Sequence, residues 1–409
     1  MSKEKVKLLW LSDSALSPTG FSNQTRNIQN RLVNDYTCFN LGHNYYGMPL
    51  IPPVVTESET FNFNILGGTP GMPYAKDMLP YYFDKVKPEI FGVLLDTFMG
   101  VMHGEWFLKT NIPAKSFWYF PSDGRFFPNS CERVLQKVDV PIAMAKFGRD
   151  QVKAQFGINA EYIPHGTDPN KFKPINEDEK RKLKARWGIP PDAFVVGANF
   201  RNQGRKMVFH KPRVLEAFFK KHPDAVALFN CDPRDVASAN NLIVLCKRMG
   251  ITHKVLYTGM QWFQGLPEDK VVEFYQMSDV NLSTTSGEGF GITTIEAMSC
   301  GVPSVITNYT TSRELITDHN AGYVVKLVGT DEEPYDHLKK WYPGEITGEW
   351  EVERGIMDAN DCIDKLELIY NSPDKARKMG LNGRDAVLRE YSWEVIMPQW
   401  KKLLQKLLQ

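Results

Sequence analysis

The sequence predicts an α/β protein in which two doubly wound parallel-sheet domains face each other across a cleft. Short β-branched or apolar runs alternate with amphipathic stretches of helical period, which is the pattern of a parallel sheet with helical crossovers. The chain has 409 residues, more than one ordinary core supports. The runs also fall into two series, which are separated by a segment rich in proline and charge at 163–191.

The first series predicts an N-terminal domain over 1–168. A helix is expected at 20–33, where apolar residues have helical spacing. Residues 40–83 are rich in Asn, Gly, Pro and Tyr, and we expect long loops there with little regular structure. Such loops in a compact domain usually form a functional surface. The expected strands are 6–12, 90–96, 116–121 and 140–145.

The second series predicts a C-terminal domain over 169–388. The last stretch, 389–409, is amphipathic and is expected to form a helix that packs back onto the N-terminal domain. Ligands of open parallel sheets bind beyond the carboxyl ends of the strands, so functional motifs should follow strands directly. The expected strands of this domain are 193–200, 225–231, 254–260, 279–285 and 303–308.

Composition narrows the class of protein. Hydrophobic residues make up 42% and charged residues 24%, as in soluble globular proteins, and a formal net charge of +1 offers no general attraction to nucleic acid or acidic membrane. The six cysteines are scattered without a CxxC pair, which argues against zinc or disulfides and fits a cytoplasmic location. Residues 1–14 are expected to hold a first strand rather than a signal peptide. No apolar run approaches the roughly 18 residues that span a bilayer, so any membrane contact is expected to be peripheral.

Residues 287–303, GEGFGITTIEAMSCGVP, follow the predicted strand 279–285 and begin a helix. Their glycines let the backbone turn tightly and expose amides. Free N–H groups at a helix N-terminus, together with the positive end of the helix dipole, form an anion site that commonly holds phosphate. The sequence therefore predicts a phosphate-binding turn at this point.

Two glutamates lie in the same motif. Thr293 and Glu296 are three residues apart and share a helix face, so one face can offer a hydroxyl to a phosphate and a carboxylate to sugar hydroxyls. Glu288, in the preceding loop, would point at whatever extends beyond the phosphate. The alternative is a capping box in TTIE, in which Glu296 satisfies only a backbone amide. Spacing alone leaves both open, but a capping box does not explain Glu288.

The stretch GEGFGITTIEAMSCGVPSV resembles the E-x7-E region of the family-4 ("group 1") retaining glycosyltransferases, which have the two-domain GT-B fold. This resemblance implies that Glu288 contacts the donor sugar and that Glu296 binds the ribose. It also implies that the residues between them meet the donor diphosphate. These residues are Gly289, Phe290, Gly291 and Thr293.

Residues 198–218 resemble the arginine-plus-lysine element of the same family, which places Arg201 and Lys206 on the donor diphosphate. A departing nucleoside diphosphate gathers negative charge, and fixed cations lower that barrier. The alternative is a solvated basic loop, because further cations surround Lys206. With the glutamate motif present we assign Arg201 and Lys206 to the diphosphate and expect the other cations to be surface residues. These are Arg205, Lys211 and Arg213.

Three further segments resemble the family more weakly. Residues 12–27 resemble its N-terminal glycine loop, which closes over the donor phosphates and gives Gly20 a backbone role with Phe21 beside it. Met260, in YTGMQW, stands where the family usually places the base of the nucleotide. His165, in the segment that resembles the hinge, could contact a ligand but is expected to be a hydrogen-bonded structural histidine.

Asp123 marks a departure from the family pattern. Many members have a histidine near the transferred sugar, in the loop after the strand equivalent to 116–121, whereas here the loop 120–128 offers Asp123. An aspartate there could hold the acceptor hydroxyl or help remove its proton. It could also bond only its own backbone in an ordinary Asp-Gly turn. Asp96 and His103 are weaker candidates.

Together these features predict a metal-independent, retaining glycosyltransferase that uses a nucleoside-diphosphate sugar, UDP- or GDP-linked. No D-x-D triplet suited to Mg²⁺ or Mn²⁺ occurs in the sequence, and no G-x-S-x-G nucleophile motif does. The leaving phosphate is therefore expected to assist deprotonation of the acceptor hydroxyl. That acceptor would be a glycan, lipid, protein or modified DNA base.

Other functions share the fold. A GT-B sugar-nucleotide epimerase would need additional acid and base groups around the sugar, and the sequence shows no such set. A glycosyltransferase acting on hydroxymethylated DNA bases is disfavoured by the balanced charge, because duplex binding draws mainly on cationic contacts to phosphates. A non-catalytic nucleotide-binding protein would not require the full set of donor-side residues.

Overall fold

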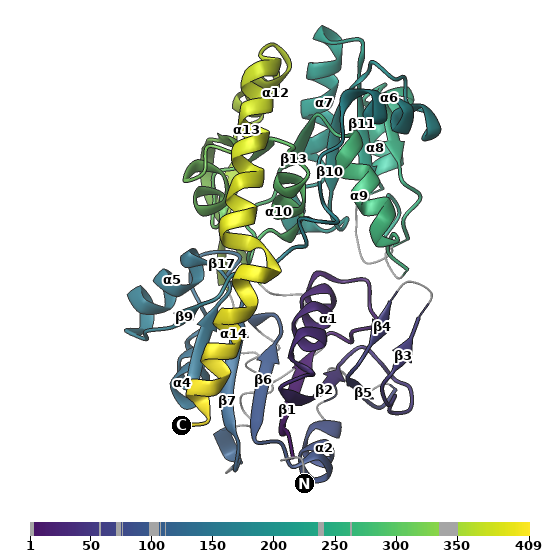
Figure 1. Cartoon of the computed structure of the whole chain (residues 1–409). Coiled ribbons are helices and arrows are strands. Elements are labelled where there is room, and N and C mark those ends of the chain that lie inside the picture. The colour runs from purple at the N-terminus through teal and green to yellow at the C-terminus, as the bar shows by residue number, and fades with distance from the viewer. Residues whose placement is uncertain are drawn as a thin grey trace.

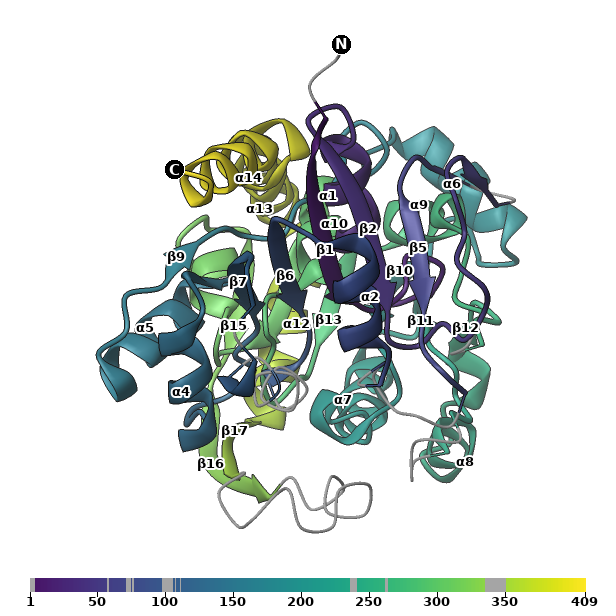
Figure 2. The same ribbon diagram turned by 90° about the horizontal axis from the view of Figure 1, so that it is seen from below.

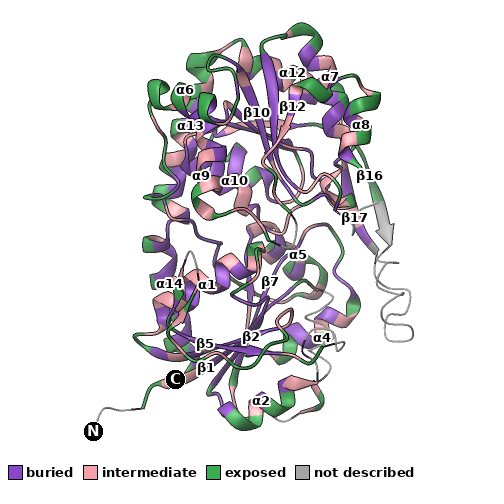
Figure 3. Cartoon of the chain, turned by 90° about the vertical axis from the view of Figure 1, so that its right-hand side faces the viewer, coloured by how far each residue is buried: buried purple, intermediate pink, exposed green. Residues whose placement is uncertain are grey.

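In this computed structural model, the chain forms two α/β domains, which lie one above the other in Figure 1. Each domain has one parallel sheet, and the strands of both sheets are largely buried (Figure 3). This confirms the predicted fold class. The structure describes residues 4–56, 59–70, 75, 77–97, 106, 108–110, 112–235, 241–261, 264–334 and 351–409.

The N-terminal domain has a seven-stranded sheet in the order β5-β2-β1-β6-β7-β8-β9, with every neighbouring pair parallel. Both faces are covered, which is why the central strand β1 reads as a nearly continuous apolar run, VKLLWLS. The strands are β1 (Val6–Ser12), β2 (Tyr36–Gly42), β5 (Asn64–Gly67), β6 (Ile90–Leu94), β7 (Lys115–Phe120), β8 (Val140–Ala143) and β9 (Glu161–Tyr162).

Helices from both ends of the chain cover this sheet. Helices α1 and α14 pack on one face, and α2, α4 and α5 pack on the other; Figure 2 shows α1 and α14 on the opposite side from α4. The bounds are α1 (Gly20–Leu32), α2 (Met78–Val86), α4 (Asn129–Lys137), α5 (Lys146–Phe156) and α14 (Trp393–Leu407).

Residues 40–83 contain more regular structure than predicted. Strand β2 ends there, β5 adds an edge to the sheet, and α2 begins; β3 (Val54–Val55) and β4 (Thr60–Phe61) form a short antiparallel pair. Strand β2 was missed because YTCFNLG carries a polar Asn40 in its middle. Asn40 is nevertheless fully buried, and its side chain accepts a hydrogen bond from the backbone N–H of Ala15 at 2.8 Å, so the fold satisfies it.

The C-terminal domain has a six-stranded parallel sheet in the order β12-β11-β10-β13-β14-β15. Five of its strands match the predicted series, and the edge strand β15 was not predicted. Helices α7, α8 and α12 pack on one face, whereas α6, α9 and α10 pack on the other. The strands are β10 (Phe194–Asn199), β11 (Ala225–Asn230), β12 (Val255–Tyr257), β13 (Val280–Ser283), β14 (Ser304–Thr307) and β15 (Gly322–Val325). The helices are α6 (Glu177–Arg186), α7 (His210–Lys221), α8 (Leu242–Arg248), α9 (Glu268–Met277), α10 (Ile292–Ser299), α12 (Ala359–Tyr370) and α13 (Pro373–Ala386).

Shorter elements complete this domain. The strands β16 (Leu327–Pro334) and β17 (Glu351–Met357) pair antiparallel outside the main sheet, and the sequence did not predict them. Single helical turns are η2 (Gly204–Lys206), η3 (Thr252–Lys254), η4 (Arg313–Thr317) and η5 (Val387–Tyr391).

The strand order reverses once in each sheet, between β1 and β6 in the first and between β10 and β13 in the second. Loops that leave neighbouring strands in opposite directions open a crevice at such a point, which is where ligands of open α/β sheets bind. The motif-bearing segments after β1, β10 and β13 all begin at these two points.

The C-terminal helices connect the two domains. Helix α13, the turn η5 and α14 run from the upper domain down beside the lower one (Figure 1). The proposed domain boundary at 168 lies between the first sheet, which ends at Tyr162, and the second, which begins at Phe194; the proposed limit at 388 falls within η5. Within the described residues, no helix has both the length and the apolar character that a bilayer span requires.

Candidate functional site

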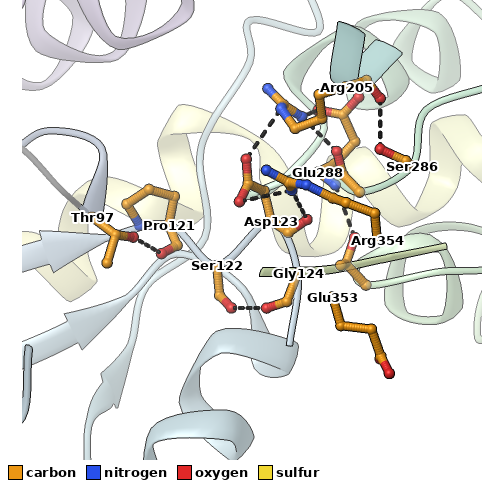
Figure 4. Close-up of polar contacts among 12 residues, drawn as sticks. Thr97, Pro121, Ser122, Asp123, Gly124, Arg205, Ser286, Glu288, Glu353 and Arg354 are labelled. Carbon is orange, nitrogen blue, oxygen red and sulfur yellow. Dashed lines mark hydrogen bonds and ion pairs between the residues drawn. The ribbon is translucent and has the colours of Figure 1, made fainter. Parts of the chain in front are cut away.

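Segments from both domains meet beside the switch point of the second sheet. The N-terminal domain contributes the loop after β7, 121–128, and the C-terminal domain contributes η2, the loop 284–291 after β13, and β17 (Figure 4). Charged side chains from these four segments point toward one another. Because the segments follow different strands, only the folded chain brings the charges together.

Glu288 lies at the centre of this cluster on the C-terminal side. Its carboxylate accepts from Lys206 Nζ at 2.5 and 2.7 Å and from Arg205 Nη1 at 3.2 Å, and its backbone N–H donates to Thr310 Oγ1 at 2.9 Å. Burial alone would raise the pKa of Glu288, but the charges of Lys206 and Arg205 outweigh it and lower the pKa to about 2. Glu288 is therefore ionised at neutral pH.

Asp123 is held between two arginines of the opposite domain. Arg205 Nε lies 3.1 Å from one carboxylate oxygen, and Arg354 Nη1 lies 3.0 Å from the other (Figure 4). Burial would raise the pKa of Asp123, but the charges of Arg354 and Arg205 hold it below its usual value. The side chain therefore does more than cap its own turn. A carboxylate with a lowered pKa is also a weak general base, which disfavours proton removal as its role.

Glu296 has the opposite environment. It is buried on α10, and its carboxyl accepts a hydrogen bond from the hydroxyl of Tyr275 at 2.8 Å. Burial raises the pKa of Glu296 to about 8. The capping-box alternative is wrong, because α10 begins after Gly291 without a side-chain cap and Glu296 points to a tyrosine of α9.

The N-termini of α1 and α10 approach each other across the domains. A Cβ on Gly20, the first residue of α1, would lie 3.1 Å from Ile292 Cδ1, the first residue of α10. Phe21 packs at the side of this contact. Two positive helix ends so close together favour an anion between the domains. Thr293 is half-buried in the first turn of α10.

The residues between the glutamates are not equivalent. The side chain of Phe290 is buried against the ring of His165, with ring centroids 5.2 Å apart, so only its backbone can meet a ligand. His165 is itself buried and paired through Nδ1 with the hydroxyl of Tyr119 at 2.8 Å. The expected structural role of His165 is confirmed, and burial lowers its pKa to about 3.

Arg201 and Met260 lie apart from the charge cluster in their described contacts. Arg201 Nε is 3.2 Å from the carboxylate of the buried Asp235, and about half of its side chain (47%) is exposed. Met260 is half-buried beside the core of the C-terminal domain. The structure thus joins Lys206, Glu288 and Asp123 in one network but gives Arg201 a different partner.

Two cations that were expected to be surface residues instead turn inward. Arg205 links Glu288 to Asp123, and Lys211 is fully buried. Lys211 Nζ donates to the backbone carbonyl of Lys206 at 3.0 Å and to Thr284 Oγ1 at 2.8 Å, which ties η2 to the end of β13. Burial lowers the pKa of Lys211 to about 7. The sequence signal was a cluster of cations after a strand, but it did not show which cations turn inward; Arg213 is exposed as expected.

The remaining candidates add little. Asp96 follows β6 close to Asp123; surrounding protein and the charge of Asp123 raise its pKa to about 6, although solvent still reaches the side chain. His103 lies outside the described residues. In the described part of the chain, no group of three or more His, Cys, Asp or Glu side chains could hold a metal ion.

Part of the C-terminal half of the chain is similar to a known family. Residues 235–349 match the family described as "Glycosyl transferases group 1". Mannosylfructose-phosphate synthase of Agrobacterium fabrum is 26% identical over 183 residues, which are 42% of this chain and 38% of that protein. A GDP-mannose-dependent phosphatidylinositol monomannoside mannosyltransferase of Mycolicibacterium smegmatis is 27% identical over 211 residues, 49% of this chain and 51% of that protein. The chain thus spans about half or less of these relatives.

Solved structures match over nearly the whole chain. Sucrose-phosphate synthase from Thermosynechococcus elongatus has a TM-score of 0.75 at 17% identity and covers 98% of this chain and 99% of its own. The Anabaena protein Alr3699/HepE, in complex with UDP-glucose, has a TM-score of 0.70 at 13% identity with the same coverage. Likeness at this identity shows the fold. The chain therefore has the two-domain GT-B fold, and residues 235–349 within it match the glycosyl transferases group 1 family.

Proposed function

We propose that this protein is a retaining glycosyltransferase that moves a sugar from a nucleoside-diphosphate donor to an acceptor hydroxyl. One observation carries the proposal: Glu288 and Glu296 flank the start of α10 at the switch point of the second sheet, while the start of α1 faces it from the other domain. The names of relatives support a sugar-nucleotide donor, since one is GDP-mannose-dependent and one neighbour was solved with UDP-glucose.

The donor would lie on the C-terminal side of the crevice. In this proposal Glu296 binds the ribose, Glu288 contacts the sugar, and Met260 borders the base. The diphosphate would be bound by Arg201, Lys206, Thr293, and the backbone of Gly289, Phe290 and Gly291. Lys206 is paired with Glu288, so a diphosphate would compete with that carboxylate for the ammonium group.

The N-terminal side would complete the site. Gly20 would approach the phosphates through its backbone, with Phe21 beside it, and Asp123 would lie near the reacting carbon. The loops within 40–83 and 123–128 would offer the acceptor surface. Since Asp123 and Glu288 are both ionised and paired, we assign removal of the acceptor proton to the departing phosphate, without a metal ion. Glu288 and Asp123 would then act by fixed charge and position.

A ligand screen tests the donor assignment. Thermal unfolding of the purified protein would be followed with UDP-, GDP- and ADP-sugars. A sugar nucleotide at a hundred times its dissociation constant should stabilise the fold by about 2.7 kcal/mol. If none of these donors shifts the unfolding temperature, the donor assignment is wrong. Isomerised sugar in the same mixtures would indicate an epimerase, and a salt-sensitive shift of duplex DNA would favour a DNA-base acceptor.

Glu288→Gln tests the catalytic assignment. We expect transfer, or hydrolysis of the identified donor, to fall about 100-fold or more, because the amide removes a fixed charge beside the sugar. Far-ultraviolet circular dichroism should stay unchanged. Arg213→Gln is a matched control, since Arg213 is an exposed cation of the same segment. Wild-type turnover in Glu288→Gln would remove this residue from the mechanism.

A further inference from the structure

Strand β17 forms a direct seam with the loop of the N-terminal domain that carries Asp123. The backbone N–H of Glu353 donates to the carbonyl of Arg125 at 3.1 Å, in an antiparallel bridge between the domains. The hydroxyl of Tyr309 donates to the carbonyl of Glu353 at 2.8 Å and accepts from the N–H of Arg125 at 3.2 Å. A Cβ on Gly124 would lie only 2.5 Å from the carbonyl oxygen of Glu353, so the two backbones are in close contact. Loop and strand thus pack as one unit.

Arg354 is the cation at this seam that reaches Asp123. Its Nη1 donates to the backbone carbonyl of Asp123 at 2.5 Å and lies 3.0 Å from the carboxylate, and its side chain is almost fully buried. Figure 4 shows Asp123 between Arg354 and Arg205. Arg354 lies beyond residues 235–349, which match the glycosyltransferase family. The sequence motifs therefore gave no reason to single it out.

The charges around Asp123 come from every segment at the seam. The cations are Arg354 on β17 and Arg205 and Lys206 on η2. The acidic neighbours are Glu288 and Asp96. Arg354 makes the largest favourable contribution to keeping Asp123 ionised. Removing Arg354 would leave Arg205 to offset the burial of Asp123 and the charge of Glu288, and the pKa of Asp123 would therefore rise.

We propose that Arg354 is a positioning residue for glycosyl transfer, which fixes the loop 121–128 against the donor half and keeps Asp123 as a permanent negative charge. This inference rests on the proposed function. Transfer from a glycosidic carbon develops positive, oxocarbenium-like charge, and a fixed carboxylate nearby stabilises it without moving a proton. In this role Asp123 stabilises the developing positive charge and does not act as an acid or a base. The contact of Arg354 with both backbone and carboxylate fixes position and charge together.

The pH profile of donor turnover separates this role from a merely structural one. Turnover of UDP-glucose or GDP-mannose, whichever the wild type binds, would be measured from pH 5 to 9. We expect Arg354→Gln to lower kcat about 10- to 100-fold at pH 8 and to add a further loss toward low pH, as Asp123 takes up a proton. In the wild type we expect turnover to stay constant at the acidic end of this range. Arg354→Lys keeps the charge but not the two-point contact, so it should show the same constant turnover at low pH but recover only part of the wild-type kcat.

Arg125→Gln is the matched control. Arg125 stands at the same seam and pairs with Glu353 rather than Asp123, with 3.6 Å between Nε and the carboxylate. Arg125→Gln should keep the wild-type dependence of turnover on pH at the acidic end of the range, whatever its effect on KM. Affinity for free UDP or GDP, measured by calorimetry, should stay within about twofold of wild type in Arg354→Gln. A parallel loss of nucleotide affinity would make Arg354 a donor ligand and overturn the positioning role.

Unfolding gives a readout that needs no donor. In the wild type the lowered pKa of Asp123 adds stability above the unfolded pKa near ~3.9, and this is lost as pH falls through the folded value. In Arg354→Gln we expect burial to raise that pKa above the unfolded value even with Arg205 in place, so that protonation of Asp123 would favour the folded state. The gap in unfolding temperature between wild type and Arg354→Gln should therefore narrow from pH 7 to pH 5. A difference in unfolding temperature that does not change with pH would overturn the proposal. So would a loss of turnover at low pH in Arg125→Gln as large as that in Arg354→Gln. If no donor binds but the difference in unfolding temperature still narrows, the proposed function is refuted. The coupling between Arg354 and Asp123 would nevertheless stand.

Discussion

Glu288 and Glu296 belong to one short motif, yet their surroundings move their pKa values in opposite directions. Glu288 faces Lys206 and Arg205, which hold its pKa near 2. Glu296 lies beside a tyrosine, and its burial raises its pKa to about 8. Titratable pairs whose environments diverge in this way are typical of sites with divided roles. At pH 7 Glu288 is therefore charged and Glu296 is mostly neutral.

The neutral state of Glu296 predicts how stability depends on pH. Its folded pKa exceeds the unfolded value near ~4.3, so its contribution is full at low pH and is lost as pH rises toward 8. Glu296→Gln keeps the shape and cannot ionise. From pH 5 to pH 8 the wild type should lose stability relative to this variant, by up to about 1.4 kcal/mol per pH unit. Urea unfolding at several pH values checks this, and parallel curves for the two proteins would contradict a buried neutral carboxyl.

At the scale of elements, the site depends on how closely three loops approach. Lys211 ties η2 to the end of β13, and Arg205 joins η2 to the carbonyl of Gly287 at 2.5 Å. The loop 121–128 of the other domain packs on the same backbone: a Cβ on Gly287 would lie 1.8 Å from the carbonyl oxygen of Asp123. Only a residue without a side chain allows this approach.

Gly287→Ala should therefore separate the loops of the two domains. The added methyl group would force backbone apart, at a cost of about 1 to 3 kcal/mol in unfolding free energy. Donor turnover should fall by more than this loss of stability explains, because Asp123 and Glu288 would shift relative to each other. Gly204→Ala is the matched control, since a Cβ there meets nothing within 4 Å. Equal turnover in the two variants would show that the close approach is not needed.

Among the described residues, two of the contacts between the domains differ in their chemistry. On the side of the C-terminal helices a continuous apolar core runs from Trp10 of the first sheet through Trp400 and Tyr391 to Phe290 of the donor loop. On the side of β17 the contact is polar and formed by ion pairs and a backbone bridge. Apolar packing does not change with pH or salt as ion pairs do. Changes in pH and salt should therefore weaken the ion pairs at β17 more than the apolar core.

Trp400 tests the apolar side. Its ring lies 5.4 Å from Trp10, 5.7 Å from Phe117 and 5.0 Å from Tyr119, and it is fully buried. Trp400→Ala should lower the free energy of unfolding by about 3 to 5 kcal/mol. The exposed Leu408, one residue beyond α14, is the control, and Leu408→Ala should change it by less than about 0.5 kcal/mol. Chemical denaturation measures both. A small effect at Trp400 would mean that α14 does not stabilise the N-terminal domain.

Sequence patterns alone predicted the two parallel sheets and the place of the motifs after their strands. Apolar runs such as VKLLWLS are local signals, and a strand buried on both faces needs nothing beyond them. The same patterns missed β2, whose buried Asn40 is satisfied by a distant backbone group. They also missed β16 and β17, which pair with each other rather than with the main sheet.

Tertiary structure decided which charges meet. The sequence by itself determined that Glu288, Glu296 and a group of cations follow neighbouring strands of one sheet. It could not show that Arg205 and Lys211 turn inward while Arg213 stays exposed, because all three are cations in one segment. Nor could it show that Arg354 crosses to Asp123, 231 residues earlier in the chain. Contacts between domains depend on how two folded bodies sit against each other, and no local pattern encodes that placement.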